Sequence, residues 1–194
     1  MKTTIKSHII ALKLLIIVFF ILLSACEENL INEYQLFVIP KGEHYCNYKV
    51  EALQENELSF MAILDSTMTY TSVEPINQHD INKLYGFSDC NDQHHENSAR
   101  FGWRWLNDTM EIHAYFYQNG IRSSILLGSV ALNEPHFYSI NLLPNVYSFQ
   151  LDDNPPVMVD RMNSCDKGFY YKLFPYFGGD ERAPHDIVIR IKEL

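Results

Sequence analysis

The sequence predicts an all-β fold, a two-sheet antiparallel sandwich or jelly roll of about ten to eleven strands. Three observations support this prediction: short extended segments recur from residue 34 onward, turn-forming residues separate them, and helical periodicity is nearly absent. The 194 residues are enough for one domain with a sizeable core, and no repeat or shift of composition marks a domain boundary.

The strand candidates follow one another with Gly, Pro, Asn and Asp between them, as at Asn119-Gly120. One short helix is expected near 80–86, because Asp80 is a suitable N-cap for that segment. All these elements belong to a single β-sandwich domain over 34–194. The strand candidates are 34–39, 45–52, 57–64, 99–106, 109–117, 122–131, 137–143, 146–151, 156–160, 169–177 and 186–192.

Residues 1–25 have the features of a bacterial secretory signal peptide. Lysines precede an apolar run over 14–23, which is shorter than the ~20 residues of a membrane-spanning helix. The run ends in Leu23-Ser24-Ala25-Cys26, which resembles the lipobox of bacterial lipoproteins. That resemblance implies cleavage before Cys26, lipidation of its thiol and a polar tether over 26–33. An uncleaved membrane anchor is the alternative.

The acidic stretch Glu27-Glu28-Asn29 lies directly behind Cys26 and resembles the surface-export signal of Bacteroidota lipoproteins. Two or more acyl chains on one cysteine anchor a protein stably to a membrane without a spanning helix. We therefore expect a lipid-anchored protein of the bacterial outer membrane, exposed on the cell surface.

The charge and composition exclude two classes of protein. The formal net charge of −9 becomes more negative without residues 1–25, which contain three lysines and no carboxylate. An acidic surface repels phosphate backbones, so no nucleic-acid partner is expected. Disordered chains have too few apolar residues to form a core, so the content of 13% aromatic and 47% hydrophobic residues excludes that class.

Besides Cys26, the chain contains three cysteines, and an oxidising envelope permits one disulfide with one thiol left over. Cys90 and Cys165 lie in polar loop segments, where a crosslink is most useful, whereas Cys46 lies in a strand-like run. We expect a Cys90–Cys165 disulfide and a buried Cys46 thiol. Spacing alone leaves the other pairings open.

The middle of the chain predicts a three-strand meander with a defined register. Apolar and polar residues alternate within 99–105 and 110–117, and a two-residue turn at Asn107-Asp108 aligns the two alternations. A second turn at Asn119-Gly120 adds the next strand. This register pairs Arg100 with Tyr115, Gly102 with His113, Trp103 with Ile112, Arg104 with Glu111, Trp105 with Met110, Tyr117 with Arg122 and Tyr115 with Ser124.

One face of this meander carries the candidate ligand-binding residues, and the other carries Trp103 and its apolar neighbours, which should pack on the second sheet. Aromatic rings stack on the apolar faces of sugars, and arginine forks bind hydroxyls and carboxylates. The face therefore predicts a polysaccharide partner, with a solvated face of ordinary cross-strand pairs as the alternative. The candidates are Arg100, Arg104, Glu111, His113, Tyr115, Tyr117 and Arg122.

No established catalytic motif is present, whether a Gly-x-Ser-x-Gly elbow, a His-Glu-x-x-His helix or a phosphate loop. The segment from Cys90 to His95 lacks the ligand spacing of a zinc site. The acidic loops 152–154 and 178–181 lack the EF-hand pattern, although oxygen ligands in them leave structural calcium open. The sequence therefore predicts no metal and no cofactor.

A catalytic alternative remains for the polar face. His113, Tyr115 and Arg100 have the side-chain types that a polysaccharide lyase requires. Tyr115 would act as acid and base, and Arg100 would neutralise a uronate carboxylate.

Several long segments resemble a family of surface lipoproteins from Bacteroidota, in particular flavobacteria. The resemblance runs from about residue 34 to the end and implies a surface-lipoprotein setting, but it carries no established activity. The segments are Asp80-Ile81-Asn82-Lys83-Leu84-Tyr85-Gly86-Phe87-Ser88-Asp89-Cys90, 97–105, Glu111-Ile112-His113-Ala114-Tyr115 and 176–187.

More loosely, the architecture resembles the concanavalin-like jelly roll of laminin-G-type lectin modules and alginate lyases. The Arg-Ser-Glu-Leu-Arg and Gln-Ile-His motifs of those lyases are missing, and Glu111-Ile112-His113 matches the second only in part. This resemblance implies the fold and leaves lyase activity as an open expectation.

These observations favour a non-catalytic, glycan-binding or adhesive lipoprotein on the outer membrane. A jelly-roll polysaccharide lyase acting on an acidic polysaccharide is the second hypothesis, and a structural envelope lipoprotein with a protein partner is the third. The shape of the three-strand face separates them, because a concave groove favours sugars and a flat face favours a protein.

Overall fold

The computed structural model describes residues 33–48, 50–53, 55–161 and 170–194. The chain divides into two units, Met1–Gln35 and Leu36–Leu194, and the second carries the fold. Its strands form two antiparallel sheets of six strands each. In the described residues the helical segments are two short 3₁₀ turns, η1 (Ser66–Met68) and η2 (Pro75–His79). The all-β prediction is confirmed.

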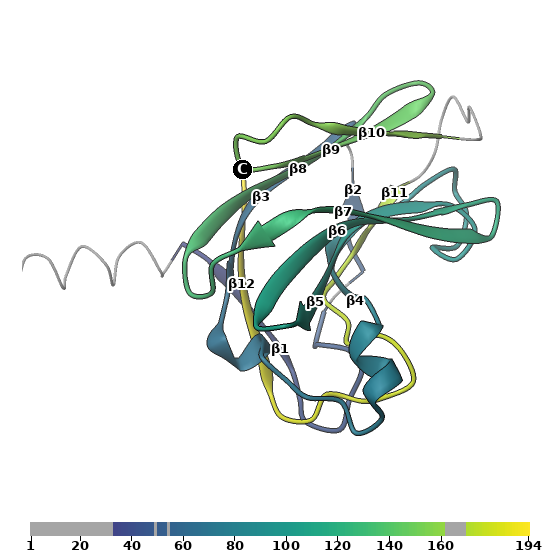
Figure 1. Cartoon of the computed structure of the whole chain (residues 1–194). Helices are drawn as coiled ribbons and strands as arrows, with labels where there is room; N and C mark the ends of the chain where they lie inside the picture. Colours follow the sequence, from purple (N-terminus) through teal and green to yellow (C-terminus); the bar gives the residue numbers. More distant parts are fainter. Residues whose placement is uncertain (1–32, 49, 54, 162–169) are drawn as a thin grey trace, which may run out of the picture. The chain divides into compact units, whose positions relative to one another are not determined.

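The two sheets lie in two layers, with β8–β10 of the first above β5–β7 of the second in Figure 1. The first sheet has the order β1-β12-β3-β8-β9-β10, and the second has the order β2-β11-β4-β5-β6-β7. In sheet order, the first consists of β1 (Gln35–Ile39), β12 (Ile187–Glu193), β3 (Glu57–Leu64), β8 (Pro135–Leu142), β9 (Val146–Leu151) and β10 (Val157–Asp160). The second consists of β2 (Ala52–Leu53), β11 (Tyr170–Leu173), β4 (Asn82–Ser88), β5 (Ser98–Leu106), β6 (Thr109–Gln118) and β7 (Ile121–Val130).

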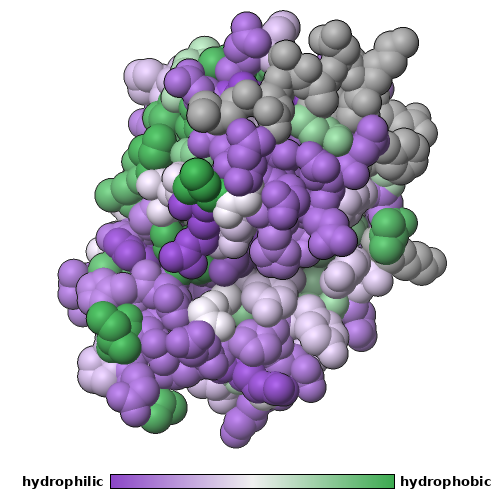
Figure 2. Space-filling model, turned by 90° about the vertical axis from the view of Figure 1, so that its right-hand side faces the viewer, coloured by the Kyte–Doolittle hydropathy of each residue, from purple (hydrophilic) through white to green (hydrophobic). Residues whose placement is uncertain are grey.

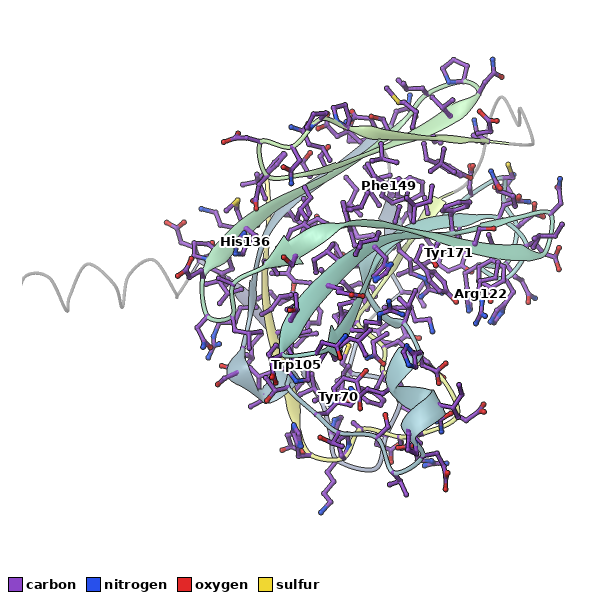
Figure 3. All side chains as sticks on the ribbon, viewed as in Figure 1. Tyr70, Trp105, Arg122, His136, Phe149 and Tyr171 are labelled. Atoms are coloured by element: carbon purple, nitrogen blue, oxygen red, sulfur yellow. The ribbon has the colours of Figure 1, made fainter. Side chains whose placement is uncertain are left out.

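The core lies between the sheets and is rich in aromatic rings. In β3 every second side chain is buried, as the two-residue period of a strand requires. Phe60 of β3 contacts Phe101 of β5 edge-on across the layers, and Phe149 of β9, labelled in Figure 3, packs on the same Phe101 ring. Trp103 is fully buried in this cluster, as the sequence predicts.

The predicted meander register is confirmed at each of the residue pairs of β5, β6 and β7 that the sequence names. Asn107 and Asp108 both have positive φ, as do Asn119 and Gly120, which is the backbone that two-residue hairpin turns require. A one-residue slip would place Arg100 and Arg104 in the core, so the alternation specifies this pairing strongly.

The helix predicted near 80–86 is wrong. Residues from Asn82 onward form β4, and the nearest helical turn is η2, which ends at His79. β4 is central in its sheet and buried on both faces, with a register shift between Lys83 and Gly86. That shift hides the alternation of a strand, and a short apolar run does not distinguish a buried strand from a helix.

Two strand predictions are only partly right. Of the segment 45–52, the structure has an isolated bridge at Tyr45 and the short strand β2. Of the segment 169–177, β11 covers only Tyr170–Leu173 before Pro175, which has no backbone N–H to give to a sheet.

Two of the cysteine predictions are confirmed, the buried Cys46 thiol and a disulfide at Cys90. Cys46 is a buried free thiol whose Sγ donates to the carbonyl of Pro175 at 3.4 Å, and burial raises its pKa to about 11. Cys90 is disulfide-bonded. Its predicted partner Cys165 lies outside the described residues, as do Cys26 and the predicted signal peptide, so the Cys90–Cys165 pairing stays a prediction.

Within the residues that the structure describes, no helix has the length and apolar character needed to cross a membrane.

Candidate functional site

The face of the second sheet that points away from the core carries a groove. It consists of two cavities, of about 490 and 410 Å³, which share His94, Arg100 and Tyr176. Both volumes fall within the roughly 300–1,000 Å³ of typical ligand pockets. Tyr171 and Arg122, one from each cavity, are both labelled on the right-hand side of Figure 3.

The two halves of the groove differ in chemistry. The larger cavity, called here the aromatic half, is lined beside the shared residues by Tyr45, Tyr48, Val50, Tyr171, Lys172, Leu173, Phe174 and Pro175. The smaller cavity, called here the cationic half, is lined by Lys83, His95, Tyr115, Tyr117, Arg122 and Gly179. Neither half has a carboxylate among its described lining residues.

Arg100 is the central residue of the groove. Its side chain is only 7% exposed, its Nε has no hydrogen-bond partner, and its guanidinium lies 5.5 Å from the ring centre of Tyr115. In the described part of the chain, no carboxylate lies within ion-pair distance of it. Burial lowers the pKa of this guanidinium, because a charge without a partner is costly away from water.

A glycine on the neighbouring strand makes room for Arg100. Gly86 of β4 pairs directly with Arg100 of β5, and a Cβ at Gly86 would lie 2.2 Å from the Cβ of Arg100. Gly86 does not have positive φ, so its backbone conformation is open to other residues. The glycine is required here by the close approach of the two strands.

Lys83 adds a second cation with no carboxylate in contact among the described residues. Its ammonium lies 5.0 Å from the ring centre of Tyr115 and 5.8 Å from that of Tyr176. Burial, followed by repulsion from Arg100 and Arg122, lowers the pKa of Lys83 to about 8, although Asp80 acts in the opposite direction. The cationic half therefore gathers three positive charges in an otherwise acidic protein.

His94 and Tyr171 form a hydrogen-bonded pair in the groove. The backbone N–H of His94 donates to the Tyr171 hydroxyl at 3.1 Å, and that hydroxyl lies 3.4 Å from the His94 Nδ1. Burial, with repulsion from Arg100 and His95, lowers the pKa of His94 to about 4. At pH 7 the imidazole is neutral, so its Nδ1 can accept a hydrogen bond from the Tyr171 hydroxyl.

Tyr115 and Tyr117 line the cationic half from β6. Burial and the neighbouring Tyr117 hydroxyl raise the pKa of Tyr115 to about 12, so its phenol is protonated at neutral pH. The Tyr115 ring is buried, which differs from the exposed stacking ring that the sequence predicts. Gly102 lies beside it, and Lys83 covers its face.

Arg104, Glu111 and His113 lie on the same sheet face but do not line the groove. Glu111 accepts from Arg104 and lies 3.1 Å from His113, and Arg104 also donates to the carbonyl of His79 in η2. Burial would raise the pKa of Glu111, but Arg104 and His113 hold it below its usual value. Burial lowers the pKa of His113.

The seven predicted ligand-binding residues are thus divided by the structure. Arg100, Tyr115, Tyr117 and Arg122 reach the groove, whereas the other three form a cluster in which Glu111 pairs with Arg104 and contacts His113. Sequence reasoning missed Lys83, His94, Tyr171 and Tyr176, which lie outside the meander. A correct assignment of β4 as a strand would have placed Lys83 opposite Gly102 and Gly86 opposite Arg100.

In each of the two loops left open for calcium, one acidic side chain is engaged internally. Asp152 accepts from the backbone of Phe137 and contacts His136, and Glu181 accepts from the backbone of Val73 and Glu74. Among the described residues, no three His, Cys, Asp or Glu side chains gather at one point. Calcium binding stays an untested expectation.

Neither a family model nor a curated protein matches the chain. Solved structures do match. The alginate lyase AlyC3 is 12% identical over 83% of this chain and 74% of its own, with a TM-score of 0.55. A Bacteroides ovatus mixed-linkage glucan GH16 protein is 10% identical over 82% and 79%, with a TM-score of 0.53. An alginate lyase from Klebsiella pneumoniae is 15% identical over 70% of this chain, with a TM-score of 0.48, and the chain spans 57% of its length.

These similarities establish the fold, a concanavalin-like jelly roll shared with alginate lyases and GH16 proteins. The predicted resemblance in architecture is confirmed at that level. At such low identity the similarity carries no residue roles to this chain.

Proposed function

We propose that the protein is a polysaccharide lyase that acts on an acidic polysaccharide in the groove of its second sheet. The observation that carries this proposal is Arg100, a buried guanidinium that lines the groove without a carboxylate partner among the described residues. The fold shared with alginate lyases and GH16 proteins supports it. The hypothesis of a non-catalytic adhesin becomes the second one.

The groove favours an anionic ligand. An unpaired charge taken out of water is strongly destabilising, and an incoming carboxylate removes that cost by forming a bidentate pair. Lys83 and Arg122 extend the positive region, so more than one carboxylate of a polyanion can be neutralised. The surrounding surface is mostly hydrophilic in Figure 2, which suits a polysaccharide better than an apolar protein partner.

Lyase chemistry fits the groove better than hydrolysis. Glycoside hydrolases of the usual kind require two carboxylates on either side of the scissile bond. The described lining of the groove contains none, and Glu111 is already paired with Arg104. β-Elimination instead requires a cation for the uronate carboxylate, a base for the C5 proton and an acid for the leaving oxygen.

The described residues provide these three groups. Arg100 pairs with the uronate carboxylate and so makes the C5 proton more acidic. Tyr171, held by the backbone N–H and the Nδ1 of His94, removes that proton through its phenolic oxygen. The C4–O bond breaks as the C4=C5 double bond forms, and the protonated phenol of Tyr115 gives its proton to the leaving oxygen.

The test uses the full chain with a panel of uronate polymers and follows the ultraviolet absorbance of the unsaturated uronate. Wild type should produce this absorbance on at least one polymer, and Arg100→Lys should lower the rate about a hundredfold, because lysine lacks the bidentate fork. Arg190→Lys is the matched control, since Arg190 pairs with Asp65 away from the groove. Binding without product would support a non-catalytic glycan-binding protein, and neither binding nor product would contradict both hypotheses.

We also propose that the protein is anchored to the bacterial outer membrane by lipid on Cys26 and exposed on the cell surface. The lipobox and the acidic residues behind it support this location. Cys26→Ser should abolish labelling by a palmitate analogue and leave the uncut precursor. A mutant that is still labelled and processed would show that the lipobox assignment is wrong.

A further inference from the structure

We propose that the aromatic half of the groove is a subsite for an uncharged sugar unit, so that the substrate alternates uronate with neutral units. The inference rests on the proposed function and specifies its substrate class. Its basis is the contrast between the two halves, which meet at Arg100, His94 and Tyr176.

Several aromatic rings in this half are exposed to solvent, and two of them are stacked on a neighbouring ring. Tyr45 and Tyr48 are 56% and 55% exposed. The Tyr48 ring is stacked on Phe174, with ring centres 5.1 Å apart, and Tyr176 is stacked on His44 at 5.4 Å. The rings of Tyr48 and Tyr176 are thus each held in place by a stacked neighbour, which lowers the entropy cost of stacking a ligand on them.

The charges in this half are already neutralised. Lys172 lines the cavity, but its ammonium pairs with Glu51 at 3.2 Å and with Glu193 at 2.6 Å. Among the described lining residues, Arg100 is therefore the one arginine or lysine of the aromatic half without a carboxylate partner, and it lies where this half joins the other.

A polymer bound across Arg100 meets two different environments. A uronate seated in the cationic half, with its carboxylate facing Arg100, Lys83 and Arg122, places a neighbouring unit against the rings of Tyr45 and Tyr48. A second carboxylate against those rings would lose water without gaining a partner, which is costly. A neutral unit, especially one with an acyl or deoxy group, buries its apolar face there without this cost.

The experiment compares two polymers that share glucuronate, hyaluronan, in which it alternates with neutral N-acetylglucosamine, and polyglucuronate, a homopolymer. Binding of each to the full chain is measured for wild type, for the double variant Tyr45→Ala/Tyr48→Ala and for Tyr45→Phe/Tyr48→Phe, which keeps both rings. We expect wild type to prefer hyaluronan. The alanine variant should bind hyaluronan about tenfold more weakly, and the phenylalanine variant should bind as wild type does.

The outcomes separate this inference from the function on which it rests. Equal loss on both polymers, or no loss on either, would overturn the neutral subsite and leave the acidic site in place. Preference for polyglucuronate would overturn it as well. If Arg100→Lys changes binding of neither polymer, the proposed function fails and the subsite fails with it.

Discussion

Two arginines of this jelly roll are equally buried and have opposite environments. Arg161 is 8% exposed and Arg100 is 7% exposed. Arg161 forms a bidentate pair with Asp89, at 2.6 and 2.9 Å, and Asp89 also accepts from the Tyr147 hydroxyl at 2.6 Å. Arg100 has no carboxylate in contact among the described residues and lines a groove. A buried charge that the fold neutralises is structural, whereas one that it leaves without a counter-charge indicates a ligand site.

The largest expected effect is on the paired arginine. Asp89→Ala removes the carboxylate that pairs bidentately with the buried Arg161 guanidinium, and we expect the free energy of unfolding to fall by about 3–5 kcal/mol. Arg100→Ala removes a charge that costs stability, so the free energy of unfolding should change by less than ~1 kcal/mol or rise. Urea denaturation of both variants measures the difference. Equal losses would show that Arg100 is also structural.

His94 of the groove and His113 of the sheet face give the next comparison. His94→Gln should lower the rate of unsaturated product by about a hundredfold, because the ring nitrogen that holds the Tyr171 hydroxyl in position is lost. His113→Gln should leave that rate nearly unchanged and lower stability by about 1 kcal/mol through its lost contact with Glu111. If the His113 variant loses activity with unchanged stability, the result would support the catalytic set that the sequence predicts, His113, Tyr115 and Arg100.

A smaller loss of stability is expected when the Tyr147 hydroxyl, which donates to Asp89 of the Asp89–Arg161 pair, is removed. Tyr147→Phe removes one hydrogen bond to a charged oxygen and should cost about 1.5–3 kcal/mol. Burial, followed by the charge of Asp89, raises the pKa of Tyr147, so the phenol is the donor at neutral pH. Product formation by Tyr147→Phe, measured well below its melting temperature, should match wild type.

A further effect is a pH dependence from Lys83, whose folded pKa is about 8 against an ordinary value of 10.5. Binding of a uronate polymer should weaken as the pH rises through about 8, because the ammonium loses its charge. Stability should change in the opposite sense, since the unfolded chain binds more protons between these two values and the folded state gains as the pH rises. Lys83→Met should remove both dependences, and their persistence would assign them to another group.

The sequence predicts best what depends on strict alternation over neighbouring strands. The register of β5, β6 and β7 follows from Trp103, Arg100 and the two turns, because one slip would bury charges. It predicts β4 badly, because that strand is buried on both faces and carries an irregularity at Lys83. The short apolar run there matches a helix equally well.

The candidate site is predicted only where the meander itself provides it. Arg100 and Tyr115 can be predicted because they are cross-strand neighbours in one hairpin. His94 and Tyr171 are 77 residues apart in the sequence, so no local pattern shows that they are in contact. Likewise, nothing local shows that Glu111 neutralises Arg104 and contacts His113, while Arg100, four residues before Arg104 on the same face, has no carboxylate in contact among the described residues. Such pairing depends on which side chains the folded sheet brings within reach.

The close contact between Gly86 and Arg100 has a consequence for comparing related sequences. Alanine at position 86 would place a methyl carbon 2.2 Å from the Cβ of Arg100 and from the carbonyl oxygen of Ala99. The two strands would have to separate, and the guanidinium would move although every charged residue of the groove was retained. A homologue with Arg100 but without Gly86 would therefore keep the charge and lose its position, a difference that a comparison of charged residues alone would not detect.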